Sequence, residues 1–206
     1  MTTRAYLAGI QTSFLQDEAG VLTTGDLDAA LTAALALYSV RAPRRVIEEY
    51  SGDGITTVLA LPAAWDTDFS RILRSYTVQG NAQPRELDRA ELWIEDTATG
   101  LKVRLLAAIA LGTTLRLVYE GRHTATATST TVPSGEQTAV GMLAAALAAD
   151  LLAIHYAAQG ETALTADVVD HRTRESLYGM RGKRYMELYE QAVPLRRHTH
   201  ALAVTR

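Results

Sequence analysis

Two pairs of residues stand at spacings that could bind a metal ion. In "WDTDF", Asp66 and Asp68 are separated by one residue, and two carboxylates in one loop can hold a divalent cation. His198 and His200 have the same spacing, but no third or fourth ligand stands near them in the sequence. The alternative for the aspartates is a turn in which they bond their own backbone. We therefore expect no metal site.

The sequence lacks the motifs of common enzyme classes. "GMRGKR" places Gly182 before Lys183, but no strand precedes it and no serine or threonine follows, so it is not a phosphate-binding loop. GxSxG and HExxH do not occur, and there is no cysteine to act as a nucleophile. We expect the protein not to be an enzyme and to use no cofactor. A hydrolase built around Asp66 and Asp68 is a competing hypothesis.

The segment "VVDHRTRESLYGMRGKRYMELYEQ" interleaves charged residues and tyrosines at helical spacing. Its basic residues alternate with acidic ones, which predicts a mixed surface and not the cationic stripe of a nucleic-acid-binding helix. Two rows follow the helical period. One row contains Leu177, Met180, Arg184 and Leu188, and the adjoining row contains Tyr178, Tyr185 and Tyr189.

These two rows exceed what one neighbouring helix can cover. One interpretation is that both rows face the core of the same chain. The other is that the tyrosines and a flanking arginine contact a second subunit, because Tyr and Arg are enriched at interface hot spots. On the second interpretation, the interface residues of this helix are Tyr178, Arg181, Tyr185 and Tyr189.

Three helices and a β region must position these residues. "TTGDLDAALTAALALYSV" has one apolar helical stripe, and Thr23 and Asp26 form a capping pair at its start. Residues 44–131 contain short runs of branched and aromatic residues between turn residues, which predicts about six strands. A long alanine-rich helix follows over residues 134–160, and the tyrosine-bearing helix ends before Pro194.

The predicted fold class is therefore α+β. We expect a helical bundle, made of an N-terminal helix and two long C-terminal helices, with an inserted small antiparallel β-sandwich or barrel of about six strands. The predicted segments are an N-terminal arm with the first helix (1–43), the β domain (44–131), the two long helices (132–193) and a C-terminal tail (194–206).

Composition excludes several protein classes. The chain has 206 residues, of which 48% are hydrophobic and 21% charged, as in globular proteins. Its net charge of -3 gives no overall attraction to nucleic acid, so any basic surface must be local. The absence of cysteine fits a reducing cytoplasm. "AVGMLAAALAADLLAIHYAA" has spanning length but contains Asp150 and His155, so we expect a buried helix and no membrane contact.

The order of features resembles the head–tail connector (adaptor) proteins of tailed bacteriophages. The resemblance rests on the helix ending in "AIHYAAQGETAL", the following "ADVVDHRTRESLYGMRGKRYMELYEQ", and the upstream "LPAAWDTDFSRILRSYTV" and "TTVP". It implies a structural virion protein, made in the cytoplasm of the host bacterium, that forms a homo-oligomeric, dodecameric ring at the head–tail interface. The ring would join the portal protein to the next tail or neck component and extend the channel for double-stranded DNA, without sequence-specific binding.

The resemblance also assigns surfaces to residues. Asp170 and Arg172 would open the long helix that such proteins use in ring packing. The tail would lie where connectors often dock to the portal, and its predicted docking residues are Leu195, Arg196, Arg197 and Leu202. The simplest connectors are mostly helical, so the β region is a departure from them. The alternative function is a nucleic-acid-binding module that uses the basic C-terminal helix and tail, with binding that weakens steeply as salt rises.

Overall fold

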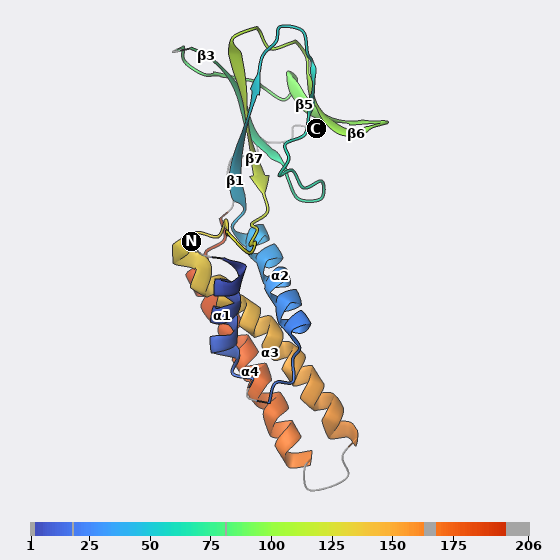
Figure 1. Ribbon diagram of the computed structural model, residues 1–206, viewed down its shortest axis with the longest axis vertical. Coiled ribbons are helices and arrows are strands. Elements are labelled where there is room, and N and C mark those ends of the chain that lie inside the picture. The colour runs from blue at the N-terminus through green and yellow to red at the C-terminus, as the bar shows by residue number, and fades with distance from the viewer. Residues whose placement is uncertain (1–2, 18, 81, 163–167, 197–206) are drawn as a thin grey trace. The chain divides into compact units, whose positions relative to one another are not determined.

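The computed structural model describes residues 3–17, 19–80, 82–162 and 168–196, and it divides into two compact units (Figure 1). A helical unit contains residues 3–43 and 123–196, and a β unit contains residues 44–122. Over this described part, four α-helices and two antiparallel sheets make the chain α+β, which confirms the predicted class. The four α-helices are α1 (Arg4–Leu15), α2 (Thr24–Arg41), α3 (Gln137–Thr162) and α4 (Val168–Ala192).

Helix α1 lies in the segment that the sequence assigned to an arm. The Thr3 side chain accepts a hydrogen bond from the backbone N–H of Tyr6 and caps the start of the helix. Its buried stripe is Leu7, Gln11 and Leu15. The Gln11 side chain donates to the backbone carbonyl of Leu27 at 3.0 Å, so a polar residue occupies the centre of the buried face. Because Gln11 is polar, the apolar residues of α1 do not show a clear helical period in the sequence.

Helix α2 begins with the predicted capping pair. The Thr23 side chain accepts from the backbone N–H of Asp26, and the Asp26 carboxylate accepts from the backbone N–H of Thr23, which completes a capping box. Its buried face contains Leu31, Ala34 and Tyr38. This face packs on α3 in one apolar cluster of the helical unit.

Helix α3 is the centre of the helical unit, in contact with α1, α2 and α4. Six of its alanines, between Ala139 and Ala149, are buried, so neighbouring helix backbones come close to this part of the helix. An added Cβ at Gly141 would lie 2.3 Å from Cγ2 of Ile10, and one at Gly182 would lie 3.2 Å from the carbonyl oxygen of Ala146. Residues 134–159 are long and apolar enough to cross a membrane, but 56% of the most apolar window is buried within the chain.

The β unit has seven strands in two sheets, counted over its described residues. One sheet has the order β1-β7-β3-β4, and the other has the order β2-β6-β5. The strands are β1 (Arg44–Ser51), β2 (Val58–Ala60), β3 (Ile72–Gln79), β4 (Arg85–Glu86), β5 (Leu92–Thr97), β6 (Gly100–Leu105) and β7 (Thr113–Gly121). The sheets do not close into a barrel. The strand that the sequence missed, β4, has two residues, too few to show an alternation.

The core of the β unit consists of large side chains from both sheets. Leu115, Leu117 and Tyr119 of β7 are fully buried and pack with Val103 and Leu105 of β6. Strand β1 alternates between half-buried and exposed residues along its length, so one face of its sheet points outward.

The two compact units divide between Arg122 and His123, whereas the sequence placed the end of the β region at residue 131. The backbone N–H of His123 donates to the Ser39 side chain at 2.8 Å, and the backbone N–H of Arg4 donates to the carbonyl of Thr126 at 2.9 Å. These bonds tie residues 123–131, a threonine-rich segment, to α1 and α2. The segment therefore belongs to the helical unit.

Candidate functional site

The predicted interface tyrosines of α4 face the interior of the helical unit. Tyr178 is buried, and its hydroxyl donates to the backbone carbonyl of Gln16 at 3.5 Å. Tyr185 is half-buried and donates to the carbonyl of Phe14 at 2.9 Å, with the two rings edge to face at 5.5 Å. Both tyrosines therefore hold α4 against the end of α1. The first interpretation, in which both rows face the core, holds for the tyrosine row only.

Tyr189 is also buried and lies near the other end of α4. The guanidinium of Arg41 lies 5.7 Å from the centre of its ring and donates to the backbone carbonyls of Val193 and Glu190. The Tyr189 hydroxyl has no hydrogen-bond partner within the described part of the chain. Burial raises the pKa of Tyr189 to about 12, which keeps it neutral at physiological pH. Its role in this chain is therefore packing.

Arg181 belongs to a layered group of aromatic and cationic side chains. The rings of Tyr156 and Tyr178 stack at 5.8 Å with an interplanar angle of 6°. The guanidinium of Arg174 lies 5.6 Å from the Tyr156 ring centre, and that of Arg181 lies 5.7 Å from the Tyr178 ring centre. Burial raises the pKa of Tyr178. The group borders a cavity of about 220 Å³, which is also lined by Gln16, Ala19 and Leu177.

Three of the four residues in the other row of α4 are exposed, and the fourth, Leu188, is half-buried. Leu177 is 39% exposed and Met180 is 62% exposed, and Arg184 is exposed and pairs with Glu187 at 3.3 Å. We call Leu177, Met180 and Arg184 the outward row. Large apolar side chains exposed on a helix face favour contact with another protein surface. The outward row is therefore the part of α4 that is available to a second subunit.

Helix α3 also exposes an apolar pair, which the sequence analysis missed. Leu151 is 41% exposed and Ile154 is 65% exposed, three positions apart and so on one face of the helix. The spacing of Leu151 and Ile154 in the sequence indicates a shared helix face. The alanine-rich residues around them favoured burial of the whole helix, so the pair was not predicted to be exposed. The outward row and this α3 pair are our two candidate interaction surfaces.

Only part of the remaining predicted interface can be described. Asp170 and Arg172 lie near the start of α4, but their side chains fall outside what the structure describes, and Arg197 and Leu202 lie outside the described residues. Leu195 is exposed. Arg196 is anchored to the helical unit, since its backbone N–H donates to the carbonyl of Arg41 at 2.9 Å and its side chain pairs with Glu136.

The aspartates of "WDTDF" form a turn. One carboxylate oxygen of Asp66 pairs with Arg122 at 2.6 Å, and the other accepts from the backbone N–H of Asp68 at 3.1 Å. The backbone N–H of Ser70 donates to the carbonyl of Asp66 at 2.7 Å. This is the backbone-bonded alternative to a cation site. Among the described residues, no group of three or more His, Asp or Glu side chains could hold a metal ion.

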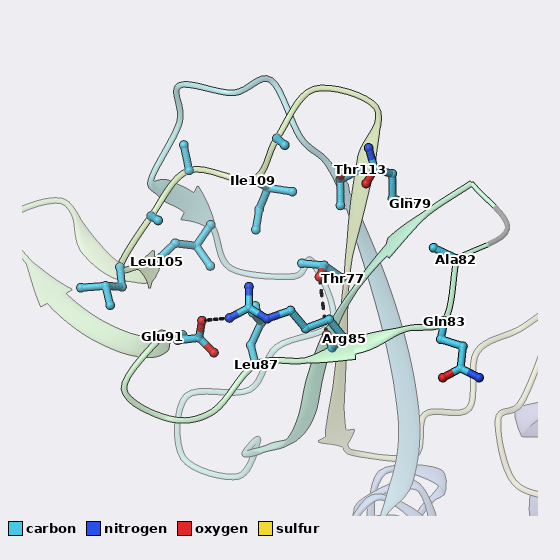
Figure 2. A pocket seen from close by; sticks show the side chains of 14 residues that line it. Thr77, Gln79, Ala82, Gln83, Arg85, Leu87, Glu91, Leu105, Ile109 and Thr113 are labelled. Atoms are coloured by element: carbon cyan, nitrogen blue, oxygen red, sulfur yellow. Dashed lines mark hydrogen bonds and ion pairs between the residues drawn. The ribbon is translucent and has the colours of Figure 1, made fainter.

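A cavity of about 360 Å³ lies in the β unit (Figure 2). Leu87, Leu105 and Ile109 give it an apolar surface, and Arg85 and Glu91 face each other as an ion pair. These two are the only acid and base among the described residues that line the cavity. Because they neutralise each other, the cavity is better suited to an apolar group than to acid–base catalysis.

No protein-family model matches the chain, and no curated protein matches it. A functional assignment therefore depends on the residues and geometry described above and on the resemblance seen in the sequence.

Proposed function

We propose that the protein is a structural component that assembles into a ring at the head–tail interface of a tailed bacteriophage. The ring joins the portal to the tail and extends the DNA channel. The order of sequence features supports this function, as does the low net charge of -3, because a mildly acidic protein exerts no strong overall attraction on a duplex.

The observation that carries the proposal is the exposed apolar character of two neighbouring long helices. A ring needs heterologous contacts, in which each subunit presents two different complementary surfaces. The outward row of α4 offers one such surface, with Met180 as its most exposed apolar residue. The α3 pair offers a second apolar surface, with Ile154 as its most exposed member.

Subunit contact through these residues replaces the role first assigned to the tyrosines. A buried tyrosine contributes to an interface only if the subunit reorganises, whereas Met180 and Ile154 can be covered without moving the core. Burial of a large apolar side chain contributes about 1.5–3 kcal/mol. Several such residues, with the flanking charges of Arg184 and Glu187, suit an interface with an apolar centre and a polar rim.

The test is the mass of the protein by light scattering, alone and mixed with the portal protein encoded alongside it. We expect a ring from the protein alone or a stoichiometric complex that forms with the portal. Met180→Asp should reduce assembly at least tenfold while its circular dichroism spectrum stays unchanged, because an aspartate would bury an unpaired charge.

Leu111→Asp is the matched control, since Leu111 is 78% exposed but lies in the β unit. It should assemble like the unmodified protein. A monomer that ignores the portal would refute the ring function. Normal assembly by Met180→Asp would instead show that the ring uses another surface.

A further inference from the structure

The outward face of the β1-β7-β3-β4 sheet carries three arginines around one point. Arg74 of β3 is directly opposite Val118 of β7. Arg116 is two residues from Val118 on the same strand, and Arg45 of β1 is opposite Glu120, two residues away on the other side. Diagonal neighbours on adjacent strands are about 7–8 Å apart, so each of these long side chains can reach the space over Val118.

These arginines line an open pocket of about 350 Å³, together with Tyr76, Pro84 and Glu86. Val118 is fully buried although it lies on the outward face, so the side chains around it cover it. Because the pocket is built on paired strands, the Cα positions of its arginines are fixed by the backbone ladder. The charged groups are therefore held together by the fold and not by a mobile loop.

Two of the three arginines have no ion-pair partner among the described residues. Arg116 pairs with Glu49, and Glu120 pairs with Arg71 through both carboxylate oxygens. Arg45 and Arg74 form no ion pair or hydrogen bond through their side chains with any described residue. Glu86 is the only acidic residue that lines the pocket, so positive charge stays in excess there. Like charges that line one pocket repel each other, and an anion between them would remove that cost.

The donor set fits phosphate groups in a chain better than a single carboxylate. One carboxylate can be paired by one bidentate guanidinium, as Arg71 pairs with both oxygens of Glu120. The pocket instead offers the guanidiniums of Arg45 and Arg74, which are unpaired among the described residues, on strands separated by β7. The Tyr76 hydroxyl, which accepts a hydrogen bond from Arg116, also lines the pocket. Arginine and tyrosine side chains are common donors to the phosphates of a nucleic-acid backbone.

We infer that this sheet face binds the phosphate backbone of double-stranded DNA through Arg45, Arg74 and Tyr76. Contacts of this kind carry no sequence information. The inference does not depend on ring formation, since the pocket lies within one β unit. It gives the β unit a role that the resemblance to connectors leaves open.

The test is fluorescence anisotropy with a labelled random-sequence duplex over a range of salt concentrations. The double variant Arg45→Gln/Arg74→Gln should bind about tenfold more weakly, and its slope of log K against log salt should be shallower by about 1.8, since each phosphate contact contributes about 0.9. Glu86→Gln should bind more tightly, because it removes the one negative charge that lines the pocket.

Arg89→Gln is the matched control, because Arg89 is an exposed arginine of the same unit that does not line this pocket. It should keep the unmodified affinity and slope. An equal loss for Arg89→Gln, or no duplex binding by the unmodified protein at low salt, would refute the site.

Competition separates the possible sources of the anion. A polyglutamate peptide that displaces the duplex at equal charge concentration would overturn the assignment to DNA, and so would displacement by millimolar inorganic phosphate. The thermal unfolding midpoint of the double variant should not fall, because the substitution removes repulsion. A fall would mean that the arginines serve folding and would also refute the inference.

Discussion

In the helical unit, the tyrosines of α4 pack inside the fold with arginine guanidiniums over two of their rings, whereas on the outward sheet face of the β unit two arginines have no ion-pair partner among the described residues. Arg41 lies over Tyr189, and Arg181 lies over Tyr178, within the helical unit. Arg45 and Arg74 line an open pocket. Arginine and tyrosine thus occur both in packing within the helical unit and at the proposed binding pocket of the β unit. Residue type alone therefore does not show which role a residue has.

The two units also build their cores differently. Around α3 the core is rich in alanine, and close backbone approach at glycine takes the place of large side chains. In the β unit the core is made of leucine, tyrosine and other large side chains between the sheets. Conspicuous aromatic residues on α4 therefore fill space that the small residues of α3 leave, which explains why they point inward.

The sharpest test of this difference is the substitution of Tyr189 by alanine. Removal of a buried aromatic ring leaves a cavity and typically costs about 3–5 kcal/mol of the free energy of unfolding. Tyr189→Phe should cost less than about 1 kcal/mol, because the hydroxyl has no hydrogen-bond partner among the described residues. Urea unfolding followed by circular dichroism measures both. A stable, monomeric Tyr189→Ala would mean that the ring is not part of the core and would restore its interface role.

A second test uses the close approach of α1 to α3. Gly141→Ala should lower the free energy of unfolding by about 1–3 kcal/mol, since its Cβ would lie 2.3 Å from Cγ2 of Ile10 and force the helices apart. Gly9→Ala is the matched control, because nothing lies within 4 Å of its added Cβ and alanine is the better helix former. Thermal unfolding should give a lower midpoint for the first variant and an equal or higher one for the second. Equal midpoints would show that the two helices are not in close contact.

Sequence patterns predicted the elements that have a clear period or a strong boundary signal. Thr23 and Asp26 form the capping box expected from their spacing, because capping depends only on residues three positions apart. The buried Gln11 interrupts the apolar stripe of α1, and its partner, the carbonyl of Leu27, comes from another helix. Nothing local in the sequence indicates that contact, so α1 was expected to be an arm.

The candidate site shows the same limit. Helical period correctly separates Tyr178, Tyr185 and Tyr189 from the row of Leu177 and Met180, because it depends only on spacing. Which row faces a neighbour depends on α1, which supplies the carbonyls of Phe14 and Gln16. The arginine pocket was not predicted, since its arginines come from three strands whose register is set by tertiary pairing.

The smallest expected effect is a pH dependence that both units share. Burial raises the pKa of Tyr189 in the helical unit and of Tyr50 in the β unit to about 12, above the ordinary value of 10.0. A raised pKa in the folded state contributes stability that is complete below pH 10 and is lost as the pH rises through 12. The free energy of unfolding should therefore decline between pH 10 and pH 12 and not change from this cause at neutral pH.

Phenylalanine variants show how much of the alkaline decline in the free energy of unfolding comes from each unit. Tyr189→Phe and Tyr50→Phe each remove one titrating hydroxyl, so each should make the alkaline decline less steep in urea unfolding. The Tyr50 hydroxyl donates to the carbonyl of Ala60 at 2.9 Å, so Tyr50→Phe should also lose about 1 kcal/mol at neutral pH. Tyr189→Phe should not, because its hydroxyl has no such bond among the described residues. If both variants lose the same stability at neutral pH, the Tyr189 hydroxyl has a partner in solution and the contrast between the two buried tyrosines disappears.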